Sequence, residues 1–253
     1  MDDISYWATV VSDYAIALAN KYWPGPMTLI FNRSENAKDF VTGGQDTVGL
    51  RVPNHALALE LLNECKRIGV HAIAAPSANR FGHVSPTTAA AVQEEISAYL
   101  SAQDVIVDGG PAHVGLESTI IDCTGDAPKI LRPGAITQAM IEEATGLKVS
   151  EDKDSQIRVS GSLEKHYAPN AKVILDTPAI AGQGFIAPAE VATPAGAIRL
   201  ASPANTDEYA RTLYSALRDG DAQGLETIAI IQPSGDGLAI AIRDRLMRAS
   251  KGR

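Results

Sequence analysis

A loop rich in hydroxyl and amide side chains follows an apolar run near the middle of the chain. The loop covers residues 75–88, APSANRFGHVSPTT, and the preceding run is VHAIA at 70–74. A buried strand that ends in such a loop and then opens a helix brings hydroxyls and N–H groups together, which suits phosphate binding. Ser77 and Ser85 therefore indicate a nucleotide contact. The alternative is that they only cap turns, and the segment alone does not distinguish the two.

Two arginines stand at the ends of apolar β runs. They are Arg51 in DTVGLRVP and Arg132 in LRPG. A guanidinium keeps its charge, so beside an apolar strand it needs an anion, and its planar fork fits a carboxylate or phosphate at two points. Together with nearby hydroxyls they predict a ligand that carries both a carboxylate and a phosphate. The hydroxyls are those of Thr47, Ser77, Ser85 and Ser118. The alternative is that each arginine pairs with an internal carboxylate such as Asp46, Glu117 or Asp122.

Common catalytic and nucleotide-binding templates are absent. The chain has no GxSxG elbow, no Walker motif and no Rossmann GxGxxG. His83 is either a base or an ordinary solvated loop histidine, and the other histidines lack metal-binding spacing. Cys65 and Cys123 are predicted to be small buried hydrophobes. We therefore assign no catalytic residue and no metal ligand.

Composition indicates a soluble globular protein with one large or two ordinary domains. The chain has 253 residues, of which 45% are hydrophobic and 21% charged. It has no apolar stretch of membrane-spanning length, and its acidic start is unlike a signal peptide. We expect a cytoplasmic protein without a membrane partner. A net charge of −8 disfavours a broad nucleic-acid surface and leaves only a local RNA contact.

Short strands alternate with helices, which predicts an α/β fold with a mixed sheet. In the first part, helices are expected at 6–22, 57–66, 86–99 and 137–145, and strands at 27–31, 47–52, 71–75, 105–108, 118–123 and 129–131. In the second part, strands are expected at 172–175, 197–200 and 227–231, with a weak one near Phe185, and helices at 207–218 and 238–249. These patterns predict a first domain at 1–149, a linker at 150–170 and a small α/β domain at 171–253.

Several longer strings resemble one known family in order and spacing. YWPGPMTLIF, DTVGLRVPNH, APSANRFGHVSPTTA, VIVDGGPAHVGLESTIID and ILRPGAIT resemble the YrdC-type threonylcarbamoyl-AMP synthases. GSLEKHYAP at 161–169 is similar to the linker of the two-domain form of that family. The resemblance implies a YrdC-like twisted mixed sheet with helices, followed by a small Rossmann-like α/β domain.

The resemblance also implies an activity. It is a nucleotidyltransferase reaction that condenses threonine, bicarbonate and ATP, with Mg²⁺, to threonylcarbamoyl-AMP and pyrophosphate, for the modification of tRNA adenosine 37. Implied partners are the tRNA-modifying threonylcarbamoyl transferase complex and a weak tRNA contact. By motif position, threonine binding falls to Arg51, the Ala75 backbone and Ser118. ATP binding falls to Thr47, Ser77, Ser85 and Arg132. Asn79 would support the loop, and His166 and Tyr167 would close over the nucleotide as a lid.

One departure from the family pattern leaves alternatives open. A PTETVYGL-like strand and turn and a KGRP-like motif should precede Met1, so we expect that the N-terminal portion of the catalytic domain is missing. The chain is then a truncated or mis-started enzyme, or a noncatalytic nucleotide- or RNA-binding module that retains part of the pocket. A third reading is a carbamoyl transferase of hydrogenase maturation. That reading normally brings an acylphosphatase-like region and zinc-finger cysteines, which this sequence lacks.

Overall fold

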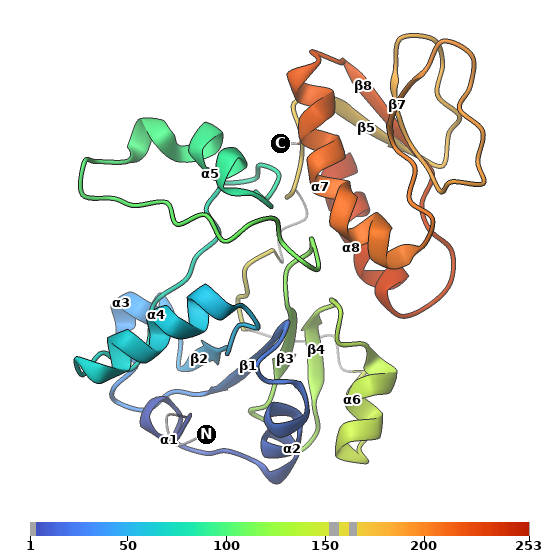
Figure 1. Cartoon of the computed structure of the whole chain (residues 1–253). Helices are drawn as coiled ribbons and strands as arrows, with labels where there is room; N and C mark the ends of the chain where they lie inside the picture. Colours follow the sequence, from blue (N-terminus) through green and yellow to red (C-terminus); the bar gives the residue numbers. More distant parts are fainter. Residues whose placement is uncertain (1–3, 152–156, 162–165, 253) are drawn as a thin grey trace. The chain divides into compact units, whose positions relative to one another are not determined.

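The computed structural model describes residues 4–151, 157–161 and 166–252. The chain divides into two compact units, each built from two stretches of sequence (Figure 1). The first unit contains residues 1–75 and 117–162, and the second contains residues 76–116 and 163–253. Each unit is organised around its own four-stranded sheet.

The sheet of the first unit is mixed. Its strands are β1 (Met27–Asn32), β2 (Thr47–Leu50), β3 (Thr119–Asp122) and β4 (Lys129–Arg132). They lie in the order β2-β1-β3-β4. β1 runs antiparallel to β2 and parallel to β3, and β3 runs antiparallel to β4.

One face of this sheet forms the apolar core of the first unit. Alternate residues of β1, namely Met27, Leu29 and Phe31, are fully buried in a cluster that also contains Leu18 and Ile141. The last two come from α2 (Asp13–Tyr22) and α6 (Gln138–Thr145), which pack against each other. Because side chains alternate along a strand, the intervening residues of β1 point to the opposite face. The short helices α1 (Ile4–Trp7) and α3 (Asp39–Thr42) and the longer α4 (Ala56–Arg67) complete this unit.

The sheet of the second unit is parallel and apolar on both faces. Its strands are β5 (Lys172–Leu175), β6 (Gly184–Ile186), β7 (Ile198–Ala201) and β8 (Thr227–Ile230), in the order β5-β8-β6-β7. Helices α7 (Thr206–Ala222) and α8 (Leu238–Ser250) lie side by side and pack on it (Figure 1). Ile228 and Ile230 face the helices, whereas Ala229 joins Phe185 in a second cluster. The same unit contains α5 (Ala89–Ile96) and the 3-10 turn η1 (Ser97–Tyr99).

The predicted fold class is confirmed: a mixed sheet with helices comes first and a parallel α/β arrangement follows. Two expected strands are wrong, since residues 71–75 and 105–108 are irregular. Their apolar side chains are largely exposed, for example Val105 at 80% and Val107 at 68%. An apolar run becomes a strand only when a neighbouring strand pairs with its backbone, and these runs have no such neighbour among the described residues.

The first helix also differs from expectation. The predicted helix at 6–22 is replaced by α1 and α2, because Ala8 leaves helical geometry and bridges to Arg33. The predicted linker at 150–170 includes residues 152–156 and 162–165, which lie outside the described part of the chain. The domain boundaries given above therefore stay a prediction. Within the described ranges, no helix is both long and apolar enough to cross a bilayer.

Candidate functional site

A polar row crosses the first sheet on the face opposite its core. Thr28 lies on that face, and its Oγ1 is 2.8 Å from the Oγ of Ser118, the residue just before β3. On the other side, β1 and β2 pair Leu29 with Leu50, and continuing this register places Arg51 opposite Thr28. Arg132 at the end of β4 completes the row. Each strand thus contributes a polar group, either from within or from the residue beside its end.

A β-bulge turns Arg132 toward this face. Ile121 pairs with Ile130, but the next pair is Ile120 with Arg132, so β4 has one extra residue, Leu131. Paired residues on neighbouring strands point to the same face, and Ile130 belongs to the core. Without the extra residue, strict alternation would point Arg132 to the core side as well. The bulge therefore redirects a charged side chain into the candidate site, as bulges commonly do.

Arg132 holds the start of β3 in place. Its Nε and Nη2 donate to the carbonyl oxygen of Ser118 at 3.1 and 2.9 Å, and Nη2 also donates to Ser118 Oγ at 3.3 Å. Nη1 donates to the carbonyl oxygen of Ser160 at 2.9 Å. Arg132 is only 7% exposed. It therefore fixes the position of Ser118 and at the same time brings a buried positive charge to the site.

The turn after β4 is fitted closely to the start of β3. A Cβ on Gly134 would lie 2.5 Å from the Thr119 nitrogen, so only glycine fits there without a shift. Thr119 Oγ1 exchanges hydrogen bonds of 2.9 and 3.0 Å with the backbone of Ile136. This local packing explains why the LRPG string belongs to the site: it sets the spacing between Arg132 and Ser118.

Arg51 carries a positive charge that no carboxylate balances within the part of the chain that the structure describes. Its Nε makes a long hydrogen bond of 3.4 Å to the carbonyl oxygen of Gly25, whose own N–H donates to Val52. Arg51 keeps surface exposure, yet partial desolvation and the positive charge of Arg132 lower its pKa. Two guanidiniums close enough to repel each other on one face make a site that favours an anion.

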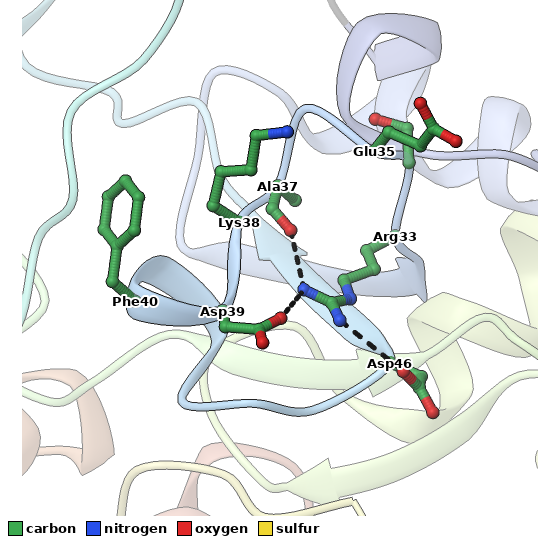
Figure 2. Close-up of a pocket in the computed structure, with 8 residues that line it drawn as sticks. Arg33, Glu35, Ala37, Lys38, Asp39, Phe40 and Asp46 are labelled. Atoms are coloured by element: carbon green, nitrogen blue, oxygen red, sulfur yellow. Dashed lines mark hydrogen bonds and ion pairs between the residues drawn. The ribbon is translucent and has the colours of Figure 1, made fainter.

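A hollow elsewhere in the first unit contains another arginine, Arg33, in the opposite arrangement (Figure 2). There the Arg33 guanidinium lies 2.6 Å from Asp39 Oδ1 and 3.7 Å from Asp46 Oδ1. It also donates to the carbonyl oxygen of Ala37 at 2.9 Å. Asp46, which the sequence offered as a partner for Arg51, therefore pairs with Arg33. The charge of Arg33 is therefore balanced by two aspartates, and this hollow offers little net positive charge to an anion.

Two predicted residues of the first unit lie away from the Arg51–Arg132 row. Thr47 pairs with Asn32 at the far end of β2, which places it about 13 Å along the strand from Arg51 at ~3.3 Å per residue. Ala75 is exposed in an irregular segment. The structure thus brings together Arg51, Ser118 and Arg132 and does not bring Thr47 to them.

The remaining predicted residues belong to the second unit. Asn79 Nδ2 donates to the carbonyl oxygens of Arg80 and His83 at 2.9 and 3.2 Å, which closes a turn. Ser85 is buried and Ser77 is exposed. His83 is not a solvated loop residue, because its side chain is mostly buried beside a carboxylate.

Tyr167 lies in the core of the second unit. It is 1% exposed, its ring stacks on Tyr214 at 5.8 Å, and the Arg245 guanidinium lies 5.4 Å from the centre of its ring. His166 meets the Tyr167 ring edge-on at 4.0 Å. The packing fixes Tyr167 firmly and leaves His166 as the more accessible member of the pair.

The described residues offer no metal-binding cluster: no group of three or more His, Cys, Asp or Glu side chains lies together in them. Both cysteines are free, and burial raises the pKa of the Cys123 thiol, as expected of a small core residue. Cys65 is only half-buried. Sequence reasoning missed Thr28 as a site residue. The signal was available, because Thr28 is the polar member of the alternating MTLIF strand.

Comparison with known proteins finds matches over both halves of the chain. Residues 1–134 match the Sua5/YciO/YrdC family, described as "Telomere recombination", and residues 136–251 match the threonylcarbamoyl-AMP synthase C-terminal domain. The chain is 34% identical to the threonylcarbamoyl-AMP synthase of Pyrococcus abyssi over 98% of its own length and 77% of that protein. It is also 34% identical to the Bacillus subtilis enzyme, over 94% and 73% of the two chains.

A solved structure extends the similarity to three dimensions. The crystal structure of Pyrococcus abyssi Sua5 complexed with L-threonine superimposes with a TM-score of 0.86 at 32% identity, over 99% of this chain and 78% of that one. Both halves of this chain therefore have counterparts in one protein. The chain belongs to the threonylcarbamoyl-AMP synthase family, in its two-domain form.

Proposed function

We propose that this chain condenses L-threonine, bicarbonate and ATP to threonylcarbamoyl-AMP and pyrophosphate. Its relatives carry the name of that enzyme, and one of them has been crystallised with L-threonine. The observation that carries the proposal is the row of Arg51, Thr28, Ser118 and Arg132 on one face of the first sheet. Arginine and hydroxyl groups in such an arrangement suit an amino acid that must present its carboxylate to a cation and keep its amine free.

Arg51 is the group that binds the threonine carboxylate. Its guanidinium makes one long hydrogen bond to Gly25, so the rest of its fork is available for a two-point contact. Ser118 Oγ accepts a hydrogen bond from Arg132, which directs its own proton toward Thr28 Oγ1 or a ligand oxygen. Arg132 thus orients a hydroxyl and adds positive charge, while Arg51 makes the direct contact.

The reaction needs little covalent chemistry from the protein. The threonine amine and bicarbonate form a carbamate and release water, and a carbamate oxygen then attacks the α-phosphorus of ATP as pyrophosphate leaves. The barrier falls when two mutually repelling anions are held in line and their charge is neutralised. The arginine row supplies fixed positive charge without reorganisation during the reaction.

Mg²⁺ enters this proposal with the nucleotide. It commonly binds substrate phosphates with only one or two carboxylates, and when bound it neutralises phosphate charge. Arginine is not a metal ligand, and no group of three or more His, Cys, Asp or Glu side chains lies together among the described residues. We therefore assign the ion to the phosphates of ATP.

The remaining assignments are part of the same proposal. Ser77 and Ser85 contact ATP from their loop, with Asn79 as the residue that closes the turn. Thr47 and Arg132 are the other ATP contacts, with Thr47 at the far end of β2, and the Ala75 backbone adds to threonine binding. His166 provides the lid contact, since Tyr167 is buried. The product then serves a threonylcarbamoyl transferase complex acting on tRNA adenosine 37, with at most a weak tRNA contact by this acidic chain.

Product formation tests the proposal. The purified chain is incubated with ATP, Mg²⁺, bicarbonate and L-threonine, and threonylcarbamoyl-AMP is detected by mass spectrometry beside pyrophosphate release. We expect both products, and neither when threonine is omitted. A chain that binds ATP but yields no threonine-dependent pyrophosphate contradicts the enzyme and favours the noncatalytic binding module.

A further inference from the structure

The segment at 76–116 packs against the rest of the second unit, although residues 117–162 of the first unit lie between them in the sequence. Val84 is buried in the apolar cluster that α7 and α8 form with the sheet. The N–H of Ala168 donates to the carbonyl oxygen of Gly82 at 3.0 Å. A Cβ on Gly115 would lie 2.4 Å from the carbonyl oxygen of Ala210 in α7. The loop proposed to contact ATP is therefore built on α7 and its neighbours.

One buried carboxylate organises the turn within this loop. The side chain of Glu95 in α5 is only 6% exposed, and its Oε1 accepts from the backbone N–H and the Nε of Arg80 at 3.2 and 3.0 Å. The same oxygen lies 3.0 Å from Nδ1 of His83. Glu95 thereby ties together both ends of the turn at 80–83, the turn that Asn79 closes from the other side.

The other carboxylate oxygen connects this turn to α7. Arg218 Nη1 lies 3.2 Å from Glu95 Oε2, and Nη2 donates to the carbonyl oxygen of Val84. Burial would raise the pKa of Glu95, but the hydrogen bonds from Arg80 and Arg218 outweigh it and lower the pKa. Glu95 is thus held as an ion between cations from the loop and from α7.

We propose that Glu95 and Arg218 are positioning residues for the nucleotide-contacting loop. They hold residues 79–84 in one conformation and so preset Ser77 and Ser85, which flank that turn. The proposal rests on the proposed function, in which this loop contacts ATP. Neither residue touches the substrate. A loop ordered in advance spends less binding free energy on its own ordering, so loss of the pair weakens ATP binding.

A purely structural ion pair would act differently. Its loss would lower the stability of the fold and raise the KM values for ATP and threonine by the same factor. A positioning pair instead raises the KM for ATP and leaves the KM for threonine nearly unchanged, because the threonine contact is assigned to Arg51 in the first unit. The ratio of the two KM values separates the two roles.

The experiment compares variants of the full chain with matched controls. Glu95→Gln and Arg218→Met remove the two charges, and Arg218→Lys keeps the charge and tests rescue. Glu94→Gln removes an exposed charge from the adjacent position of α5, and Arg211→Met removes an exposed one from α7. Steady-state kinetics for ATP and threonine, thermal unfolding and hydrogen exchange of residues 78–88 are measured for each.

We expect the KM for ATP to rise about tenfold in Glu95→Gln and Arg218→Met, which is the loss of one charged hydrogen bond. In the same two variants the KM for threonine stays near the value of the unmodified chain, and hydrogen exchange at 79–84 accelerates. Arg218→Lys recovers part of the effect, and the control variants change neither the KM for ATP nor the exchange. An unchanged ATP KM, or an equal rise for both substrates, overturns the proposal.

Hydrogen exchange keeps this test separate from the proposed function. It needs no turnover, so an unmodified chain that makes no product contradicts the enzyme assignment alone. Unaltered exchange at 79–84 in Glu95→Gln contradicts the positioning role even if the chain is fully active. Should Glu95→Gln fail to fold, the Arg218→Met variant decides by the same exchange readout: accelerated exchange at 79–84 supports the proposal and unaltered exchange overturns it.

Discussion

The two sheets of the molecule differ in what covers their faces. In the second unit, Ile228 and Ile230 pack under the helices while Ala229 packs on the other side, so both faces are apolar. In the first unit the main apolar cluster lies on one face, and the other face combines the buried Ile30 and Ile120 with the polar side chains of Thr28 and Arg132. A parallel sheet covered on both faces carries apolar side chains there, whereas a mixed sheet can carry charged and hydroxyl groups on one face. This difference supports the proposal that substrate binding belongs to the first sheet and a supporting role to the second.

Substitutions in the second core should change stability most. Leu213 is fully buried in α7, so Leu213→Ala is expected to lower the free energy of unfolding by about 2–5 kcal/mol. Urea denaturation measures the loss. Leu61→Ala in α4, where the side chain is more than half exposed, is the control and should change stability little. Equal losses at both positions would contradict the role of the second unit as a well-packed support.

Substitution of Arg51 should change catalysis most. Arg51→Gln is expected to lower kcat/KM for threonine about a hundredfold, equivalent to about 2.7 kcal/mol, while unfolding is nearly unaffected. The fold should tolerate the change because, among the residues that the structure describes, Arg51 makes a single long hydrogen bond. Pyrophosphate release measures the rate, and Arg67→Gln, an exposed arginine of α4, is the control. Full activity of Arg51→Gln would contradict the assignment of substrate binding to the first sheet.

The close approach of Gly115 to α7 should be sensitive to one methyl group. Gly115→Ala adds a Cβ that would contact the α7 backbone at a residue with φ of +80°, and we expect a loss of about 1–3 kcal/mol in unfolding free energy. Gly110→Ala is a matched control, since Gly110 has φ of +83° but no atom within 4 Å of an added Cβ. The difference between the two variants isolates the contact, and no difference would show that it contributes nothing.

The smallest expected effect is the pH dependence contributed by Glu95. Its pKa is lowered in the folded protein from an ordinary value of 4.5, so its ionised form stabilises the fold above that pH and the contribution disappears as pH falls through the lowered pKa. The difference in urea midpoint between the unmodified chain and Glu95→Gln should therefore shrink below pH 4.5. A difference that grows with acidification would have the wrong sign.

The sequence predicted much of the fold because apolar alternation and turn residues are local signals. The β runs at Met27, Thr47 and Lys129 all became strands, and the two arginines at strand ends were recognised because a permanent charge beside an apolar run is conspicuous. The two expected strands that the structure lacks failed because strand formation also depends on backbone pairing with a neighbouring strand. The run at 71–75 has the composition of a buried strand but no hydrogen-bonded neighbour among the described residues.

The geometry of the site depends on register, which composition does not reveal. The bulge at Leu131 turns Arg132 away from the core, and nothing in ILRPG alone indicates an extra residue. Thr47 and Arg51 share the string DTVGLRVP, but the extended strand between them places Thr47 at the other end of β2. The contact between Thr28 and Ser118 joins residues 90 positions apart, which no local pattern indicates.

The most direct test of the central claim is calorimetric titration of the chain with L-threonine and with L-threoninol, which has a hydroxymethyl group in place of the carboxylate. If Arg51 binds the carboxylate, threoninol should bind the unmodified chain at least about tenfold more weakly than threonine, and Arg51→Gln should bind both alike. Equal affinity of the unmodified chain for the two compounds, or discrimination that survives in Arg51→Gln, would contradict the account.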